Sequence, residues 1–363
     1  MKKILYLMNV DWNWIKQRPH FLAEQLAHYY DITVVNQYRY TKKGYQSRKF
    51  DGNFVSFKVV PRIDRYASFR WINVILKKKV LKNLIDSEKP DFIWLTDPDQ
   101  INWLPKELGN AHLIYDCMDD HYGLSTNKKK KEDILVNEKK LCERCEYLFV
   151  SSTYLTVMLR KRYGESLSSK ITVVRNGYDG KIKEIGELPY QGGANKKFIA
   201  AYFGTIAEWF DFDLIKKSLG DYDNLEYRLI GPTAHGVVVP ENSRIKYLGT
   251  VEHKDLYRNI VDVDCLIMPF KLNESIKAVD PVKLYEYINF KKNIICIGYQ
   301  EVSRFEQFAY FYRDYSEYKK ILCELMATKN LKYTDDMRVV FLKDNSWGVR
   351  SKLIADTLEN ARN

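Results

Sequence analysis

The sequence contains few cysteines, no second metal-type motif and no long hydrophobic run. Six cysteines among 363 residues are too few for a disulfide framework. Cys142 and Cys145 form one CxxC pair, but no second pair stands at zinc-site spacing. No stretch approaches the roughly 20 apolar residues of a membrane span, and the apolar run after Met1 is too short for a signal peptide. We therefore expect a cytoplasmic globular chain with reduced thiols and no metal.

Acidic residues are outnumbered, and the formal net charge is +11. Such an excess can attract nucleic acid, anionic lipid or phosphorylated ligands. The 27 tyrosines are scattered rather than patterned as an RNA-stacking platform, so no nucleic-acid partner is predicted. Residues 71–86 read as an amphipathic helix with a face of lysines, Lys77, Lys78, Lys79 and Lys82. That face suits the inner surface of an anionic membrane; the alternative is a solvated surface.

Short apolar runs alternate with helical patterns throughout, which predicts an α/β fold of two Rossmann-like halves with parallel sheets. We expect a first domain over residues 1–178, a linker rich in glycine and polar residues over 179–197, and a second domain over 198–345. Residues 346–363 are expected to form a helix that packs back on the first domain. The carboxyl edges of the two sheets are expected to face an interdomain cleft.

Polar and aromatic residues follow the first predicted strand, residues 4–8. They include Trp12, Trp14, Arg18 and His20. This loop lacks GxGxxG, so it gives no support for a dinucleotide site. At a strand's carboxyl end, tryptophan and arginine suit contacts to a sugar face and an anion. The alternative is that Trp12 and Trp14 pack beneath the loop.

A cluster of carboxylates follows the strand predicted over 113–115. Asp116, Asp119 and Asp120 precede His121. Neighbouring carboxylates repel, so at least one could have a raised pKa and take part in proton transfer. The alternative is a polar turn that caps the next helix.

Glycines close two strands of the second half, at Gly204, before Thr205, and at Gly231. Glycine at a strand end allows a tight turn or the close approach of a phosphate.

A buried strand over 265–270 is followed by Asp280, Pro281, Lys283, Leu284 and Glu286. Pro281 suits a first helical turn and Asp280 suits the cap before it. Lys283 and Glu286 stand three apart and share a helix face. By itself this stretch is a capped surface helix with an incidental charged pair; its place after a parallel strand leaves a ligand site as the alternative.

Five motifs occur in an order that resembles the retaining GT-B glycosyltransferases grouped as family four, especially those of bacterial cell-wall, teichuronic-acid, capsule and exopolysaccharide assembly. They are Trp12-x-Trp14-x-x-Gln17-Arg18-Pro19-His20, Tyr115 to Asp120, Asn176 to Asp179, Phe203-Gly204, and Pro281 to Tyr287. The resemblance extends nearly end to end.

The resemblance implies donor binding by Gly204, Thr205, Gly231 and the stretch from Asp280 through Glu286. Glu286 would accept from ribose hydroxyls, and Lys283 would meet the leaving phosphate. Asp119 or Asp120 would act on the acceptor, with Trp12, Trp14, Arg18, His20 and Asp116 as acceptor or phosphate contacts.

The sequence departs from the family pattern in one respect. Relatives often carry an acid eight positions before Glu286, where this chain has Ala278; Glu274 and Asp280 are the nearest acids.

The function implied is transfer of a sugar, from a UDP-sugar by preference, to a hydroxyl of a glycan or lipid-linked glycan. Such enzymes generally need no metal or cofactor. Two alternatives use the same architecture: a nucleotide-sugar epimerase and a non-catalytic carbohydrate-binding subunit.

Overall fold

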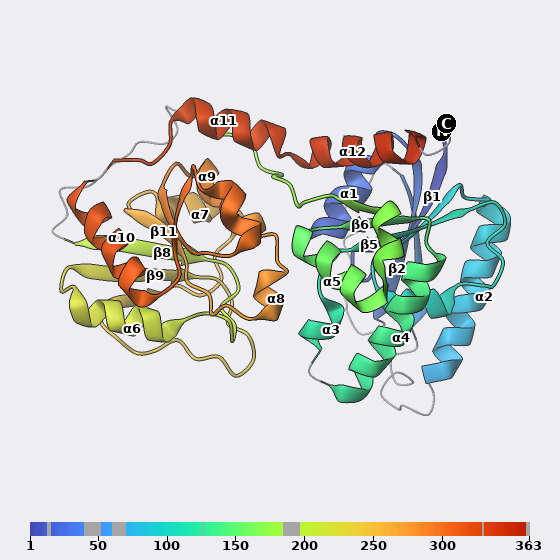
Figure 1. The fold of residues 1–363 in the computed structure, drawn as a ribbon, viewed down its shortest axis with the longest axis horizontal. Coiled ribbons are helices and arrows are strands. Elements are labelled where there is room, and N and C mark those ends of the chain that lie inside the picture. Colours follow the sequence, from blue (N-terminus) through green and yellow to red (C-terminus); the bar gives the residue numbers. More distant parts are fainter. Residues whose placement is uncertain are drawn as a thin grey trace. The chain divides into compact units, whose positions relative to one another are not determined.

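The computed structural model describes residues 1–12, 16–39, 52–59, 70–125, 127–183, 197–328 and 330–360. The chain divides into two compact units. Unit 1 comprises Met1–Gly177 together with Trp347–Asn363, and unit 2 comprises Tyr178–Ser346. The chain therefore passes between the units at Gly177 and again at Ser346. Each unit is an α/β layer structure around one parallel sheet (Figure 1).

Unit 1 contains a seven-stranded sheet in the order β3-β2-β1-β4-β5-β6-β7, with every neighbouring pair parallel. The strands are β1 Lys3–Leu7, β2 Asp31–Arg39, β3 Asn53–Val59, β4 Phe92–Leu95, β5 His112–Cys117, β6 Tyr147–Val150 and β7 Ile171–Val173. The helices are α1 Arg18–Leu26, α2 Arg70–Glu88, α3 His121–Leu124, α4 Lys128–Arg144, α5 Thr153–Tyr163 and α12 Trp347–Asn360, with short 3₁₀ segments η2 Pro98–Trp103 and η3 Glu165–Ser169.

The core of unit 1 is built on stacked aromatic rings between its central strands. Trp94 lies with its ring centroid 5.3 Å from those of Tyr6 and Phe149, one on each side in the sheet. The C-terminal helix α12 adds Trp347, Ile354 and Leu358 to the same core. Trp347 stacks on Phe21 of α1 at 5.1 Å. The C-terminal helix is thus a component of unit 1.

Unit 2 contains a six-stranded parallel sheet in the order β10-β9-β8-β11-β12-β13. The strands are β8 Phe198–Phe203, β9 Leu225–Ile230, β10 Ile245–Tyr247, β11 Cys265–Met268, β12 Asn293–Ile297 and β13 Ala309–Tyr312. The helices are α6 Phe212–Asp221, α7 His253–Ile260, α8 Glu274–Lys277, α9 Val282–Asn289, α10 Tyr315–Ala327 and α11 Asp335–Asp344, with the 3₁₀ segment η5 Gln300–Phe305.

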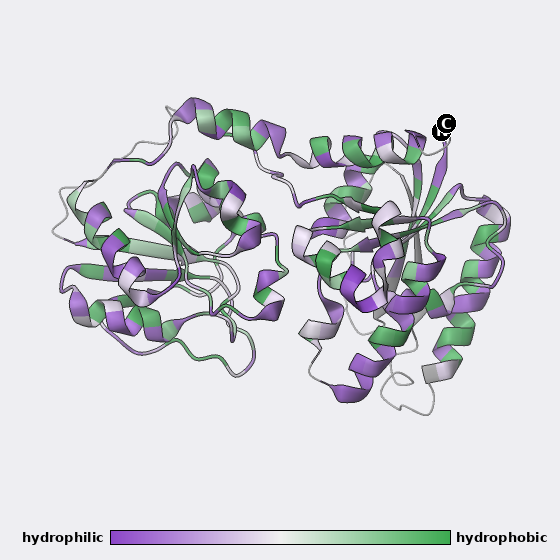
Figure 2. Ribbon diagram, in the orientation of Figure 1, coloured by the Kyte–Doolittle hydropathy of each residue, from purple (hydrophilic) through white to green (hydrophobic). Residues whose placement is uncertain are grey.

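The apolar runs of the sequence form the central strands because both faces of each sheet are covered by helices. Every residue of β4, β8, β11 and β12 is buried, as expected for strands covered on both faces by helices. The outer helices alternate hydrophobic and hydrophilic residues along their length (Figure 2). The predicted α/β class with two Rossmann-like parallel sheets is confirmed.

Some element boundaries differ from the sequence prediction. The residues from Arg18 to His20 were expected in a loop, but they form the first turn of α1. Gln17 and His20 make a reciprocal capping box there, which satisfies amides that a loop would leave free. The strand β13 and the helices α6, α10 and α11 were not predicted.

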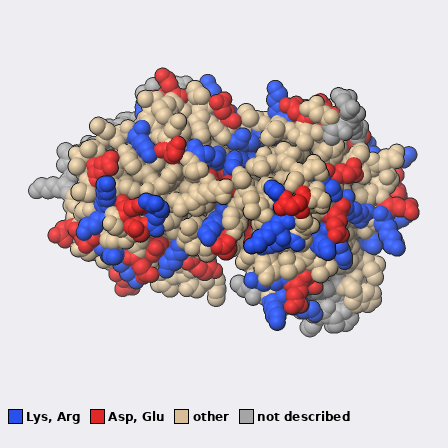
Figure 3. All heavy atoms as spheres, viewed as in Figure 1, with Lys and Arg blue, Asp and Glu red and all other residues tan. Residues whose placement is uncertain are grey.

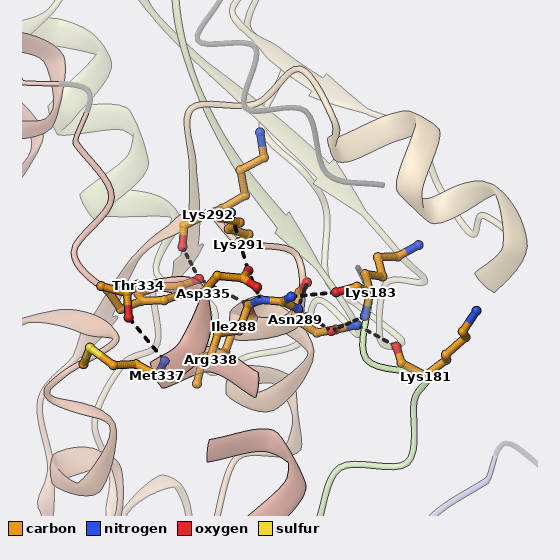
Figure 4. Close-up of polar contacts among 11 residues, drawn as sticks. Lys181, Lys183, Ile288, Asn289, Lys291, Lys292, Thr334, Asp335, Met337 and Arg338 are labelled. Carbon is orange, nitrogen blue, oxygen red and sulfur yellow. Dashed lines mark hydrogen bonds and ion pairs between the residues drawn. The ribbon is translucent and has the colours of Figure 1, made fainter. Parts of the chain in front are cut away.

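A buried polar network ties the start of unit 2 to the end of α9 (Figure 4). Asn289 donates to the Tyr178 hydroxyl at 2.6 Å and accepts from the Lys183 amide at 3.1 Å. Arg338 of α11, with no exposed surface, donates to the Lys183 carbonyl at 2.6 Å and to Asn289 Oδ1 at 3.1 Å. Asp335 completes the pairing of Arg338 at 2.9 Å. The network fixes residues 178–183 against the helix that carries Lys283 and Glu286.

Candidate functional site

In unit 2, the candidate residues gather at the carboxyl ends of three neighbouring strands. Gly204 follows β8, Gly231 follows β9, and α9 begins beyond β11. These strands are adjacent in the order β9-β8-β11. At β8 the connections diverge toward opposite edges of the sheet, which is the position where open α/β sheets bind ligands.

Gly204 and Gly231 stand at positions where a side chain would be strained. Their φ angles are +142° and +131°, a region that side chains disfavour. A Cβ on Gly231 would overlap the carbonyl oxygen of Gly204, and one on Gly204 would overlap Cε and Nζ of Lys283. The Gly204 amide donates to the Ile230 carbonyl at 2.8 Å, which joins the two turns. The glycines therefore let the two turns and the Lys283 side chain pack closely against one another. Thr205, which follows Gly204, is exposed.

Lys283 lies directly against the Gly204 backbone. Its ammonium has no hydrogen bond or ion pair with any residue that the structure describes. Burial lowers the pKa of Lys283, and the charge of Glu286 opposes that shift. A partly buried cation that forms no ion pair with the described residues is a site that suits an anionic ligand. Lys283 and Glu286 occupy one side of α9, as their spacing predicted.

Helix α9 is held on the sheet by its apolar side. The Tyr287 hydroxyl donates to the Ile267 carbonyl of β11 at 3.1 Å and accepts from the Phe203 amide of β8 at 3.4 Å. Leu284 has no exposed surface, and Pro281 is also buried. The Leu284 side chain therefore belongs to the core, and only its backbone is available to a ligand.

The structure corrects the expected role of Asp280 as a helix cap. Helix α9 begins after Pro281, which is its N-cap, so Asp280 lies one residue earlier. Its buried carboxylate accepts from the Arg304 guanidinium. Beside it, Tyr299 donates to the Val279 carbonyl at 3.1 Å. Arg304 and Tyr299 thus fix the turn that leads into α9.

At the position where relatives have an additional acid, this chain has an apolar residue, and that residue is buried. Ala278 is 2% exposed at the end of α8. Glu274, at the start of α8, is exposed and pairs with Lys277 at 2.7 Å.

In unit 1, Arg18 and Asp116 form one buried ion pair. The guanidinium donates to the Asp116 carboxylate through Nε at 3.1 Å and through Nη2 at 2.8 Å. Nη1 donates to the Val174 carbonyl at 2.7 Å. Both side chains are buried, so the pair links α1, β5 and the end of β7. This placement favours a structural role over the predicted contact with a substrate phosphate.

His20 and Trp12 are likewise inside unit 1. His20 is fully buried, and its Nδ1 accepts from the Gln17 amide at 3.2 Å. Trp12 is 1% exposed and lies 5.3 Å from the His20 ring. The burial corrects the prediction that these two rings face a substrate, and for Trp12 it favours packing beneath the loop. Trp14 lies outside the described residues.

Asp119 and Asp120 differ sharply in environment. Asp120 accepts from Arg162 of α5 at 2.8 and 3.2 Å. The Asp119 carboxylate is partly buried and has no partner among the described residues. Burial raises the pKa of Asp119, while the charges of His121 and Arg18 act in the opposite direction. Asp119 is therefore the carboxylate suited to proton transfer, and Asp120 is an ion-paired anchor.

Three partners of the candidate residues were not foreseen: Arg162, Arg304 and Tyr299. Each is distant in sequence from the residue or turn it holds and belongs to no motif. Nothing in the local sequence signals them. Within the described ranges, no group of three or more His, Cys, Asp or Glu residues is placed to hold a metal ion, and no helix is long and apolar enough to cross a membrane.

Comparison with known proteins gives one relative and many similar folds. No family model matches the chain. TuaH of Bacillus subtilis (strain 168), assigned as a teichuronic acid biosynthesis glycosyltransferase, is 21% identical over 210 residues. The match covers 54% of this chain and 52% of TuaH, so the chain spans about half the length of this relative.

Solved structures match over the whole chain. Sucrose-phosphate synthase from Thermosynechococcus elongatus has a TM-score of 0.72 at 11% identity, with 99% of each chain covered. HepE of Anabaena, in complex with UDP and glucose, has a TM-score of 0.68 at 14% identity, covering 99% of this chain and 100% of that one. The apo lipopolysaccharide outer core galactosyltransferase WaaB has a TM-score of 0.66 at 12% identity, with 99% and 100% covered.

The two parallel sheets and these likenesses define the class: the chain has the GT-B fold of two Rossmann-like domains. The predicted resemblance to GT-B glycosyltransferases is confirmed. In the part that they share, the chain is similar to the teichuronic acid glycosyltransferase TuaH.

Proposed function

We propose that the protein transfers a sugar from a nucleoside-diphosphate sugar, a UDP-sugar by preference, to a hydroxyl of a glycan or lipid-linked glycan in bacterial cell-surface polysaccharide assembly. One observation carries this proposal: the Lys283 ammonium, which has no ion pair among the described residues, lies against the Gly204 backbone at the carboxyl end of β8. This arrangement supplies a charge beside a backbone that a phosphate can approach closely.

The residues of unit 2 would act on the leaving group. Breaking the anomeric C–O bond leaves negative charge on the diphosphate. Lys283 would stabilise that charge, together with the positive end of the α9 dipole. Glu286, one turn further along α9, would accept from the ribose hydroxyls. Gly204, Thr205 and Gly231 would contact the donor through their backbones.

The residues of unit 1 would act on the acceptor. Asp119 has a raised pKa, and its carboxylate, which has no hydrogen bond or ion pair in the part of the chain that the structure describes, could orient or deprotonate a hydroxyl. If the donor configuration is retained without a covalent intermediate, the leaving phosphate could take the proton and Asp119 would position the acceptor. If configuration is inverted, Asp119 would be the base. Asp120 would hold the loop through Arg162.

The similar proteins support this assignment. TuaH and WaaB are named as glycosyltransferases, and HepE was solved with UDP and glucose. We further propose that transfer needs no metal and that the protein works at the cytoplasmic face of an anionic membrane. Activity should therefore persist in EDTA; a strict requirement for Mn²⁺ would contradict this part of the proposal.

The deciding experiment begins with a thermal-shift screen of UDP, GDP, dTDP and CDP sugars. The best binder is then tested for donor hydrolysis. Lys283→Ala should weaken nucleotide binding at least about tenfold, because a charge-assisted phosphate contact contributes roughly 1.5–3 kcal/mol. Lys277→Ala, which removes an exposed lysine paired with Glu274, is the matched control and should bind normally.

Two results would overturn the proposal. Stabilisation by no nucleotide sugar would favour a carbohydrate-binding subunit. Conversion of the donor to its epimer without acceptor, seen by NMR, would favour an epimerase.

A further inference from the structure

Unit 1 has a pocket away from Asp119 and the Arg18–Asp116 pair. It has a volume of about 620 Å³ and lies where α2, η2 and the end of α4 meet. Its lining residues are Lys78, Ile101, Asn102, Leu104, Pro105, Lys106, Lys140, Glu143 and Arg144. The pocket is therefore formed by residues from α2, from η2 and the segment after it, and from the end of α4.

The rim of this pocket is cationic. Lys78, Lys106 and Lys140 are exposed, and their ammonium groups have no ion pair or hydrogen bond with the described residues. The lining acid, Glu143, lies 3.9 Å from Lys139, a weak exposed pair. On the face drawn in Figure 3, Lys and Arg are interspersed with Asp and Glu. Three unpaired ammonium groups around one concavity attract a phosphate.

The wall and floor of the pocket are rigid and largely apolar. Arg144 donates to the carbonyls of Pro105 and Lys106 at 2.9 and 2.8 Å, so its guanidinium fixes that segment. Ile101 and Leu104 are 7% and 3% exposed. Lys77 places its ammonium 4.1 Å from the Trp103 ring centroid, which packs α2 against η2. The pocket thus pairs a charged rim with an apolar interior.

Large apolar side chains stand exposed beside the lysines. On α2, Trp71 is 60% exposed and Ile75 is 54% exposed. They precede Lys78 by seven and three residues, so the three share one helical stripe. On α4, Val136 is 53% exposed and lies one turn before Lys140.

Helices α2 and α4 run in the same direction, because each leads into a strand of the same parallel sheet (Figure 1). Both therefore carry their exposed apolar residues on the same side of the pocket. A merely solvated basic helix needs no such residues, whereas a surface that enters a lipid headgroup layer has both kinds.

We propose that this pocket binds the phosphate of an anionic lipid, with Lys78, Lys106 and Lys140 on the phosphate and Trp71, Ile75 and Val136 among the acyl chains' upper carbons. The site makes no use of Lys283 or Asp119, so it stands whether or not the proposed sugar transfer is correct. In this proposal, part of the net charge of +11 acts at a defined site, the rim of the pocket.

The test is cosedimentation of the full chain with vesicles of phosphatidylcholine alone or mixed with phosphatidylglycerol. Binding should require the anionic lipid and should weaken with salt. The triple variant K78E/K106E/K140E should bind at least about 100-fold more weakly, since each lysine near an anionic surface contributes about fivefold. The charge-matched control K320E/K343E/K352E alters three exposed lysines outside the pocket and should lose much less.

A double variant tests the contribution of the exposed apolar side chains. Trp71→Ser combined with Ile75→Ser should reduce vesicle binding about tenfold or more, while the dependence of binding on salt is kept. The thermal unfolding midpoint of this variant should not fall, because both side chains are already exposed.

Three outcomes would overturn the proposal. Equal binding to neutral and anionic vesicles is one, and equal losses in the two triple variants is another. The third is lysine-dependent binding of a soluble phosphate ester, such as glycerol phosphate, by a chain that does not bind vesicles.

Discussion

Asp120 shares two hydrogen bonds with Arg162, whereas the Asp119 carboxylate beside it has no partner among the described residues. Two adjacent aspartates thus differ in their contribution to stability: one carboxylate is ion-paired and the other is not, within the described residues. A buried, unpaired carboxylate is costly, and such groups are kept where function requires them. The same contrast separates Arg18, enclosed by Asp116 and a carbonyl, from Lys283, which lies against the Gly204 backbone and has no ion pair among the described residues.

Asp119→Asn and Asp120→Asn should therefore have opposite effects on stability. Asp119→Asn should leave the free energy of unfolding unchanged or raise it, because a poorly solvated charge is removed. It should also abolish transfer. Asp120→Asn should lower the free energy of unfolding by about 3 kcal/mol, because the close ion pair with Arg162 is lost and only the longer contact of Arg162 to Glu138, at 3.8 Å, remains. Denaturant unfolding measures both, and equal destabilisation by the two variants would contradict the assignment.

The lowered pKa of Lys283 predicts a pH dependence of nucleotide binding. The protonated ammonium is the form that binds phosphate, and burial shifts its loss of charge to a lower pH than for an ordinary lysine. Affinity should therefore be greatest at low to neutral pH and fall as the pH rises through that pKa. Titration calorimetry from pH 6.5 upward measures this, and Lys283→Arg, which keeps its charge, should flatten the profile. A profile identical in both would rule out Lys283 as the titrating group.

At the scale of elements, the turns after β8 and β9 define the site in unit 2. Their glycines let two backbones touch, and Lys283 covers the place where a side chain would stand on Gly204. Helix α9 is kept in register with these turns by Tyr287, which bonds to both β8 and β11. The site thus depends on backbone shape as much as on charged side chains.

Gly231→Ala should lower the free energy of unfolding by about 2 kcal/mol or more, because the new methyl group would meet the Gly204 carbonyl at an unfavourable φ. It should also weaken nucleotide binding. Gly220→Ala near the end of α6 is the control: nothing lies within 4 Å of its added methyl group. That variant should be neutral or stabilise by about 0.5–1 kcal/mol. Equal midpoints for both variants would show that the close approach at Gly231 is not required.

At the scale of the whole molecule, the path of the chain determines how each of the two units is completed. The two crossing segments, after Gly177 and before Trp347, are paired inside unit 2, where the Tyr178 amide donates to the Asn345 carbonyl at 2.8 Å. The final helix then completes the core of unit 1. Unit 1 therefore depends on residues at both ends of the sequence.

Neighbouring substitutions on α12 test this dependence. Ile354 is fully buried, so Ile354→Ala should lower the free energy of unfolding by about 3 kcal/mol. Leu353 is 40% exposed, and Leu353→Ala should change it by less than about 0.5 kcal/mol. If both variants unfolded like the unaltered protein, α12 would not be part of the core in solution.

The sequence by itself determined the αβ rhythm, the buried strands, the glycine turns and the shared face of Lys283 and Glu286, because each depends on the spacing of near neighbours. Only the tertiary structure decided which charged residues form ion pairs with one another. Asp116 meets Arg18 across 98 positions, Asp120 meets Arg162 across 42, and Asp280 meets Arg304 across 24. Such pairs arise where separate elements pack, so no local pattern encodes them. For the same reason the burial of Trp12, the freedom of Asp119 and the lysine-rimmed pocket between α2 and α4 emerged only from the packed chain.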